Sequence, residues 1–302
     1  MLATSLFLAL FCGLAEATDI AVGPAETHTT ITSALAAATA GDRILVQSGT
    51  YTNQLLLTSD IEILGQTNLV IIQPTTGDNS IEVTGADVDV ILDKLTVNGN
   101  SARRNFLVTD GADVTMTNIV SQKSAPSDAK DGGTLRVDNY STVTLSDSIW
   151  DDATTAGSKH GGHIAAINSY LDLDKVTLAE GTADSGGAIY VDGGSLTLNS
   201  TNLNYNNAVA NGGAIAIANA VSNSNIDISI NTTTFADNDA GGTGGHVYGR
   251  DVATVWLQDC EFGSTTNSTG IDIANIASAF YLRQANFATD SGAVELDTID
   301  AA

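Results

Sequence analysis

The sequence predicts an all-β protein: a single-stranded parallel β-helix, or solenoid, of roughly ten coils with a short N-terminal capping helix. The first supporting pattern is an aliphatic-x-aliphatic triplet followed after four residues by a position that is usually large and apolar. It occurs eight times between residues 90 and 287, at intervals of 24 to 32 residues. The second is a glycine pair that opens a short apolar strand five times between residues 132 and 249. Repetition at such intervals is typical of stacked supersecondary units.

The N-terminus reads as a secretory signal. Leu2 to Leu14 are almost wholly apolar, and Ala15-Glu16-Ala17 forms a small-x-small cleavage site, so we predict a signal at residues 1–17 and a β-helix domain at 18–302. A buried N-terminal helix is the alternative, because the first forty residues contain no lysine or arginine. No later apolar run approaches membrane-spanning length. We therefore expect a secreted, extracellular or cell-surface protein without a transmembrane segment.

The predicted domain begins with a capping helix. Ile31, Leu35 and the alanines up to Ala38 form a short helical stretch, with Thr30 available as N-cap and Gly41 just beyond its end. We place this cap at about residues 28–41. Short runs of alternating apolar residues follow up to residue 65 and are separated by Gly, Asn, Asp and Thr, which is typical of strands and turns.

Each later coil combines a glycine-opened strand with an aliphatic-x-aliphatic strand, and each strand pairs with its counterpart in the next coil. Aligning the glycine pairs places the following residues in one outward row: Arg136, Ala165, Tyr190, Ala216 and Tyr248. The row beside it contains Thr134, His163, Ala188, Ala214 and His246. Residues 291–297 resemble the opening strand of a further coil without a cap. Self-association through this end and truncation of the chain are both compatible with that pattern.

Two parts of the chain resemble known families. Residues 31–65, with Gly41-Asp42-x-Ile44-x-Val46 and Gly49-Thr50-Tyr51, are similar to the entry into right-handed β-helices of the pectin-lyase-like superfamily. The Gly-Gly-Ala-Ile copies at residues 186–189 and 212–215, with Phe235-Ala-Asp-Asn238, resemble the repeats of polymorphic outer-membrane proteins, which are surface adhesins. The resemblance covers roughly residues 30–300. It implies a right-handed helix, and it implies either carbohydrate activity or adhesion.

Composition excludes some partners. The formal net charge of −24 repels nucleic acid and anionic membranes, although solubility in a salty exterior also explains it. Only Cys260 remains after removal of the signal, so the mature chain has no intrachain disulfide. We predict no cofactor and no metal site; calcium held by acidic turns is the one alternative.

The residues that could carry chemistry are few. In the resembled superfamily the glycine-opened sheet commonly forms the saccharide groove, which implies carbohydrate contacts at Arg136, Tyr190 and Tyr248. The densest ionisable patch supplies the weak catalytic candidates: Asp151, Asp152, His160 and His163. His163 and His246 are three coils apart, about 14 Å, so they cannot share one ion or one scissile bond. Isolated surface tyrosines and a polar corner loop are the plain alternatives.

Four Asn-x-Ser/Thr sequons would carry glycans in a eukaryotic secreted chain: Asn139, Asn199, Asn231 and Asn267. The sequence as a whole favours a non-catalytic secreted β-helix that acts as a cell-surface, extracellular-matrix or adhesion element, with a glycan or cell-surface ligand as partner. The alternative is a polysaccharide lyase, hydrolase or epimerase. The absence of a convergent acid–base set favours the first reading.

Overall fold

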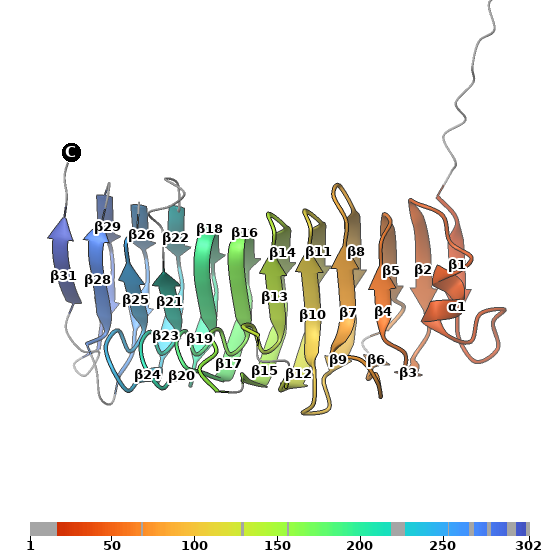
Figure 1. Cartoon of the computed structure of the whole chain (residues 1–302), viewed down its shortest axis with the longest axis horizontal. Helices are drawn as coiled ribbons and strands as arrows, with labels where there is room; N and C mark the ends of the chain where they lie inside the picture. The colour runs from red at the N-terminus through yellow and green to blue at the C-terminus, as the bar shows by residue number, and fades with distance from the viewer. Residues whose placement is uncertain are drawn as a thin grey trace, which may run out of the picture.

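The computed structural model describes residues 17–67, 69–127, 130–155, 157–218, 227–252, 254–265, 269–276, 279–288 and 294–299. In Figure 1 the strands lie side by side along one axis, from β1 at the N-terminal end to β31 at the C-terminal end. Every pairing between the described strands is parallel and joins one coil to the next, so the predicted parallel β-helix is confirmed. All of the predicted signal except Ala17 lies outside the described residues.

Each coil contributes three strands, which stack into three faces. Face 1 contains β4 (Leu55–Leu57), β7 (Asn79–Thr84), β10 (Arg104–Thr109), β13 (Leu135–Asp138), β21 (Ile215–Ala218), β25 (Val247–Arg250), β28 (Ile271–Ile276), β31 (Val294–Ile299) and the first halves of β16 (Ile164–Asp174) and β18 (Ile189–Asn199). Face 2 contains β1 (Asp19–Val22), β2 (Asp42–Val46), β5 (Ile61–Gly65), β8 (Asp89–Asp93), β11 (Asp113–Thr117), β14 (Thr142–Ser146), β22 (Asp227–Asn231), β26 (Thr254–Gln258), β29 (Ala279–Arg283) and the second halves of β16 and β18.

Face 3 is a separate sheet of shorter strands. It contains β3 (Gly49–Tyr51), β6 (Val70–Ile72), β9 (Thr96–Asn98), β12 (Val120–Ser124), β15 (Ile149–Thr154), β17 (Thr177–Ala183), β19 (Asn202–Asn204), β23 (Thr234–Ala236), β27 (Glu261–Phe262) and β30 (Asn286–Phe287), with β20 (Asn207–Ala208) and β24 (Asp239–Ala240) continuing past β19 and β23. Faces 1 and 2 belong to one sheet because β16 and β18 run through the corner between them.

The eight aliphatic-x-aliphatic copies are all strands of face 2, and their register confirms the repeat. Val90 pairs with Val114, Val114 with Val143, and the series continues without a slip to Phe280. The residue that follows each copy, which is apolar in every copy except at Ser121, is the inward residue of face 3. Trp150 and Phe235, for example, are fully buried. Burial of one column of aliphatic and aromatic side chains supplies the main favourable free energy of this fold.

The predicted cap is a five-residue helix, α1 (Ile31–Leu35). The Thr30 side chain accepts a hydrogen bond from the Ser33 amide at 3.1 Å, as expected of an N-cap. Ile31 and Ala34 are buried against the first strands. At the other end β31 pairs with β28, so residues 294–299 do open a further coil. The inward Leu282 of β29 is 41% exposed. Self-association through this end stays a prediction.

Candidate functional site

The outward row predicted on face 1 is present. Register pairs Arg136 with Ala165, Ala165 with Tyr190, Tyr190 with Ala216, and Ala216 with Tyr248. Tyr190 and Tyr248 are therefore two coils apart, about 10 Å at the spacing of parallel strands. The next outward row pairs Asp138 with Ile167 and Ile167 with Asp192, which places two carboxylates beside the same stretch.

Arg136 is the centre of a half-buried ion-pair network. Its Nε donates to Asp138 Oδ2 at 2.7 Å, and its Nη1 lies 3.8 Å from Asp131 Oδ2. The three side chains are only 16–22% exposed. The other carboxylate oxygen of Asp138, Oδ1, is buried without a hydrogen-bond partner. A buried acceptor left unpaired is uncommon in a folded protein and marks a place where a ligand or water could bind.

His160 extends this network toward Tyr190. Its backbone amide donates to Asp131 Oδ1 at 2.9 Å. Its imidazole stacks on the Tyr190 ring, with ring centroids 4.5 Å apart. Its Nδ1 lies 3.9 Å from Asp184 Oδ2 and is buried without a hydrogen-bond partner. We call Asp131, Arg136, Asp138, His160, Asp184 and Tyr190 the His160 cluster.

Glycine pairs bring these residues to one place. Gly132 donates its amide to the His160 carbonyl, and Gly161 donates to the Ser185 carbonyl, so the corners of three coils stack in register. Gly161 has a φ of +69°, and a Cβ on it would lie 2.1 Å from the Ile164 carbonyl oxygen. Only glycine fits such a corner. The residue just before each pair, Asp131 or His160, is consequently held at the rim of face 1.

Burial raises the pKa of Tyr190 to about 12, and the negative charges of Asp192 and Asp131 add to the shift. The phenol therefore stays protonated at any physiological pH. It can donate a hydrogen bond to a sugar hydroxyl while its ring offers an apolar surface.

The other predicted catalytic candidates do not join this cluster. Asp151 and Asp152 lie on β15 of face 3, where both are exposed. Asp152 has a φ of 53°, and the residues at the same position in the coils before and after it, Lys123 and Glu180, have φ values of 52° and 58°, so a left-handed residue recurs here in register. These two carboxylates therefore belong to a different face from His160.

His163 is placed inside the corner and not in a row on the surface. It is fully buried, its Nε2 donates to the Ala179 carbonyl at 2.7 Å, and the Thr134 hydroxyl lies 3.4 Å from its Nδ1. Burial lowers its pKa to about 4, so it is neutral at pH 7. Both ring nitrogens are engaged, which gives His163 a structural role.

His246 repeats this arrangement three coils later. Its Nε2 donates to the Gly263 carbonyl at 3.0 Å, and its ring is tilted against both members of the stacked Phe235–Phe262 pair, at centroid distances of 5.7 and 5.8 Å. Burial again lowers its pKa. The prediction that the two histidines share no site agrees with their separate corners.

Tyr248 belongs to a second, smaller cluster on face 1. The Arg250 guanidinium carbon lies 4.6 Å from the centre of the Tyr248 ring, and its two terminal nitrogens lie 2.8 and 3.3 Å from the oxygens of Asp272. Asp272 is 3% exposed. Its burial acts to raise the pKa, but the hydrogen bonds from Arg250 and Thr243 lower it overall. This bidentate pair fixes the tyrosine in place.

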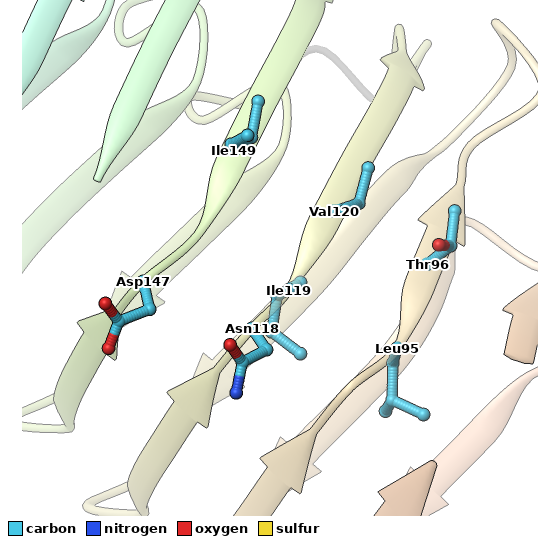
Figure 2. A pocket seen from close by; sticks show the side chains of 7 residues that line it. All are labelled: Leu95, Thr96, Asn118, Ile119, Val120, Asp147 and Ile149. Carbon is cyan, nitrogen blue, oxygen red and sulfur yellow. The ribbon is translucent and has the colours of Figure 1, made fainter. Parts of the chain in front are cut away.

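A pocket of about 140 Å³ lies at the corner between faces 2 and 3 and is shown in Figure 2. It crosses three coils and is lined by Leu95, Thr96, Asn118, Ile119, Val120, Asp147 and Ile149. Its single carboxylate, Asp147, has no other acid–base side chain beside it in this lining. In the part of the chain that the structure describes, no group of three or more His, Cys, Asp or Glu side chains could hold a metal ion.

The three sequons among the described residues lie outside face 1. Asn139 is exposed at the turn after β13, and its Nδ2 donates to Asp110 Oδ1. Asn199 and Asn231 end their strands on face 2 and are linked by a side-chain hydrogen bond of 3.1 Å. Asn267 lies outside the described residues. Glycosylation of these residues stays a prediction.

Comparison with known proteins gives neighbours of structure only. No family model and no curated protein matches the chain. Two solved structures that are similar to it are the pectin methylesterase from Aspergillus niger and the pectin methylesterase PemA from Erwinia chrysanthemi. The first is 17% identical with a TM-score of 0.37, and covers 94% of this chain and 90% of its own. The second is 16% identical with a TM-score of 0.39, and covers 94% and 93%. At these values no residue role passes from either enzyme to this chain. No helix among the described residues is long and apolar enough to cross a membrane.

Proposed function

We propose that the protein is a secreted polysaccharide-active enzyme whose substrate lies along face 1. The observation that carries the proposal is the His160 cluster. It joins a histidine, a neighbouring carboxylate and a tyrosine donor, and it contains two buried polar atoms that lack partners, His160 Nδ1 and Asp138 Oδ1. The sequence favoured a non-catalytic element because no acid–base set converged. We prefer the alternative because Asp184 lies 3.9 Å from the His160 imidazole, while Asp131 accepts the His160 backbone amide and holds the residue in place.

In this proposal the His160 imidazole is the general acid or base that exchanges a proton with the bound sugar. Asp184 orients the imidazole, and the 3.9 Å separation from Nδ1 shortens when substrate fills the site, because hydrogen bonds in unliganded sites are often long. Tyr190 holds the sugar through its ring and its permanently protonated hydroxyl. Arg136, held by Asp138 and Asp131, fixes the rim of the site.

Face 1 suits a polymer better than a small molecule. The rows continue past the cluster to Tyr248, about 10 Å from Tyr190, so successive sugars can contact successive coils. The side chains of Ala165 and Ala216, on either side of Tyr190, are short and almost completely buried. They therefore do not project beside the Tyr190 ring.

A polysaccharide screen tests the proposal. Homogalacturonan with and without methyl esters, neutral β-glucan and galactan are incubated with the protein, with and without calcium. Reducing ends, released methanol and unsaturated uronate are measured. We expect turnover of one polymer, a loss in kcat of at least about 100-fold in His160→Gln, and a raised KM in Tyr190→Phe.

Tyr170→Phe is the matched control, because Tyr170 is an exposed tyrosine on face 2 and should leave both constants unchanged. Binding to face 1 without any turnover would return the protein to the non-catalytic class. Turnover that survives in His160→Gln would remove the proposed proton donor.

A further inference from the structure

A stacked aromatic pair stands on face 2, on another side of the coil from the His160 cluster. Trp256 of β26 and Tyr281 of β29 are register partners. Their ring centroids are 3.7 Å apart with an interplanar angle of 15°. Both are widely exposed, at 43% and 44%. Two large rings stacked in water cost hydrophobic free energy that burial against a ligand would recover.

Among the described residues, only short side chains follow one another on one side of the indole. Tyr281 covers the side of Trp256 that looks toward the next coil. On the other side the register partner of Trp256 is Ser229, whose side chain is short, and beyond it lies Thr197. Asn231 donates to the Ser229 hydroxyl at 3.1 Å, so this floor is polar and ordered. A pyranose ring that packs on the indole finds an apolar face beside it and hydroxyl groups beneath it.

The charge beside the pair selects among sugars. Arg283 lies two residues beyond Tyr281 on the same side of β29, about 7 Å away, and is exposed. The other five arginines each contact a carboxylate or a carbonyl oxygen. Arg283 makes no such contact with another described residue. A guanidinium without a carboxylate partner in the described part of a chain of net charge −24 is complementary to an anionic group, and carboxylates bind it in a bidentate manner.

We propose that Trp256, Tyr281 and Arg283 form a binding site for acidic sugars, with a pyranose ring packed on Trp256 and its carboxylate, or that of the adjoining sugar, bound by Arg283. This site is separate from the His160 cluster, and it holds whether or not face 1 is catalytic. It would anchor the protein to a uronate-containing glycan and leave face 1 free.

The test measures binding of trigalacturonate, with maltotriose as the neutral probe of the same length. The two tryptophans differ in burial: Trp150 is fully buried and Trp256 is exposed. Acrylamide quenching therefore reports on Trp256. We expect trigalacturonate to protect the exposed tryptophan in a saturable way, and added salt to weaken that protection.

Calorimetry on variants assigns the residues. Trp256→Ala should weaken trigalacturonate binding at least tenfold, and Arg283→Gln at least fivefold with no change for maltotriose. Tyr170→Ala and Arg43→Gln are matched controls, an exposed tyrosine elsewhere on face 2 and an exposed arginine paired with Asp19, and should bind normally. His160→Gln should leave the protection of Trp256 from acrylamide unchanged, which separates this site from the proposed enzyme site.

Three results would overturn the proposal. The first is no protection of Trp256 by trigalacturonate, and the second is equal binding by wild type and Arg283→Gln. The third is protection that rises with protein concentration alone, together with a dimer in sedimentation velocity, which would assign the aromatic pair to a second copy of the chain.

Discussion

Acidification should destabilise this β-helix through His163. The residue is fully buried, and its neutral form uses both ring nitrogens: Nε2 donates to the Ala179 carbonyl, and Nδ1 faces the Thr134 hydroxyl. A proton on Nδ1 would add a charge without a carboxylate partner among these contacts. Burial accordingly lowers the pKa to about 4, from about 6.5 in an unfolded chain.

The sign and size follow from proton linkage. Between pH 6.5 and 4 the unfolded chain binds a proton at this histidine and the folded chain does not, so acid favours unfolding. The contribution of neutral His163 to the free energy of unfolding is fully present above pH 6.5 and is lost as the pH falls toward 4. Each pH unit in that window costs about 1.4 kcal/mol, or about 3 kcal/mol in all. His246, whose pKa is also lowered by burial, acts in the same direction.

Urea unfolding at pH 7, 6, 5 and 4.5, followed by the fluorescence of the buried Trp150, measures this loss. His163→Gln should be less stable at pH 7 but should show a smaller slope of unfolding free energy against pH, by about 1 kcal/mol per unit. His28→Gln, at a partly exposed position before α1, should keep the wild-type slope. The reasoning fails if His163→Gln keeps that slope, or if the His163 resonance titrates near pH 6.5.

Two further changes test the coil corners. Gly187→Ala should lower the free energy of unfolding by more than about 2 kcal/mol, because its Cβ would lie 2.2 Å from the Gly213 carbonyl oxygen. Gly41→Ala is the control: it has open space around it and should lose only about 1 kcal/mol, from its positive φ. Equal losses in the two variants would contradict the predicted clash. Asn206→Ala should lower the free energy of unfolding, measured by heat or urea, by about 2–3 kcal/mol. Asn206 is fully buried and forms hydrogen bonds with Leu178, Gly181 and Asn238, which belong to neighbouring coils. A loss below about 0.5 kcal/mol would show that these hydrogen bonds contribute little.

The sequence was sufficient for the fold because a solenoid repeats one constraint. Each aliphatic-x-aliphatic strand must place two side chains inside the coil, and each strand must pair with the copy before it. The triplets and the glycine pairs together therefore determined the register of faces 1 and 2. The sequence pattern located only two of the three strands of each coil, because the face 3 strands are only two to seven residues long.

The candidate site was predicted only in part, because the alternation of inward and outward side chains along a strand does not hold at the corners between faces. Gly161 in the left-handed region turns the chain, so His163 and Ile164 are consecutive and both buried, which no period-2 pattern would indicate. Likewise, Asp152 has a left-handed backbone conformation within β15, which places that carboxylate on face 3, away from His160. Aligning the residues before each glycine pair, Asp131 with His160 and Ser185, would have found the acid side of the cluster.

The most direct test of the central claim is the rate of polysaccharide turnover by wild type beside His160→Gln. The account predicts turnover of at least one polymer in the wild type, reduced at least about 100-fold in the variant, while urea midpoints stay close because His160 lies at the rim of the fold. Equal rates in the two proteins, or glycan binding to face 1 with no turnover in either, would contradict it.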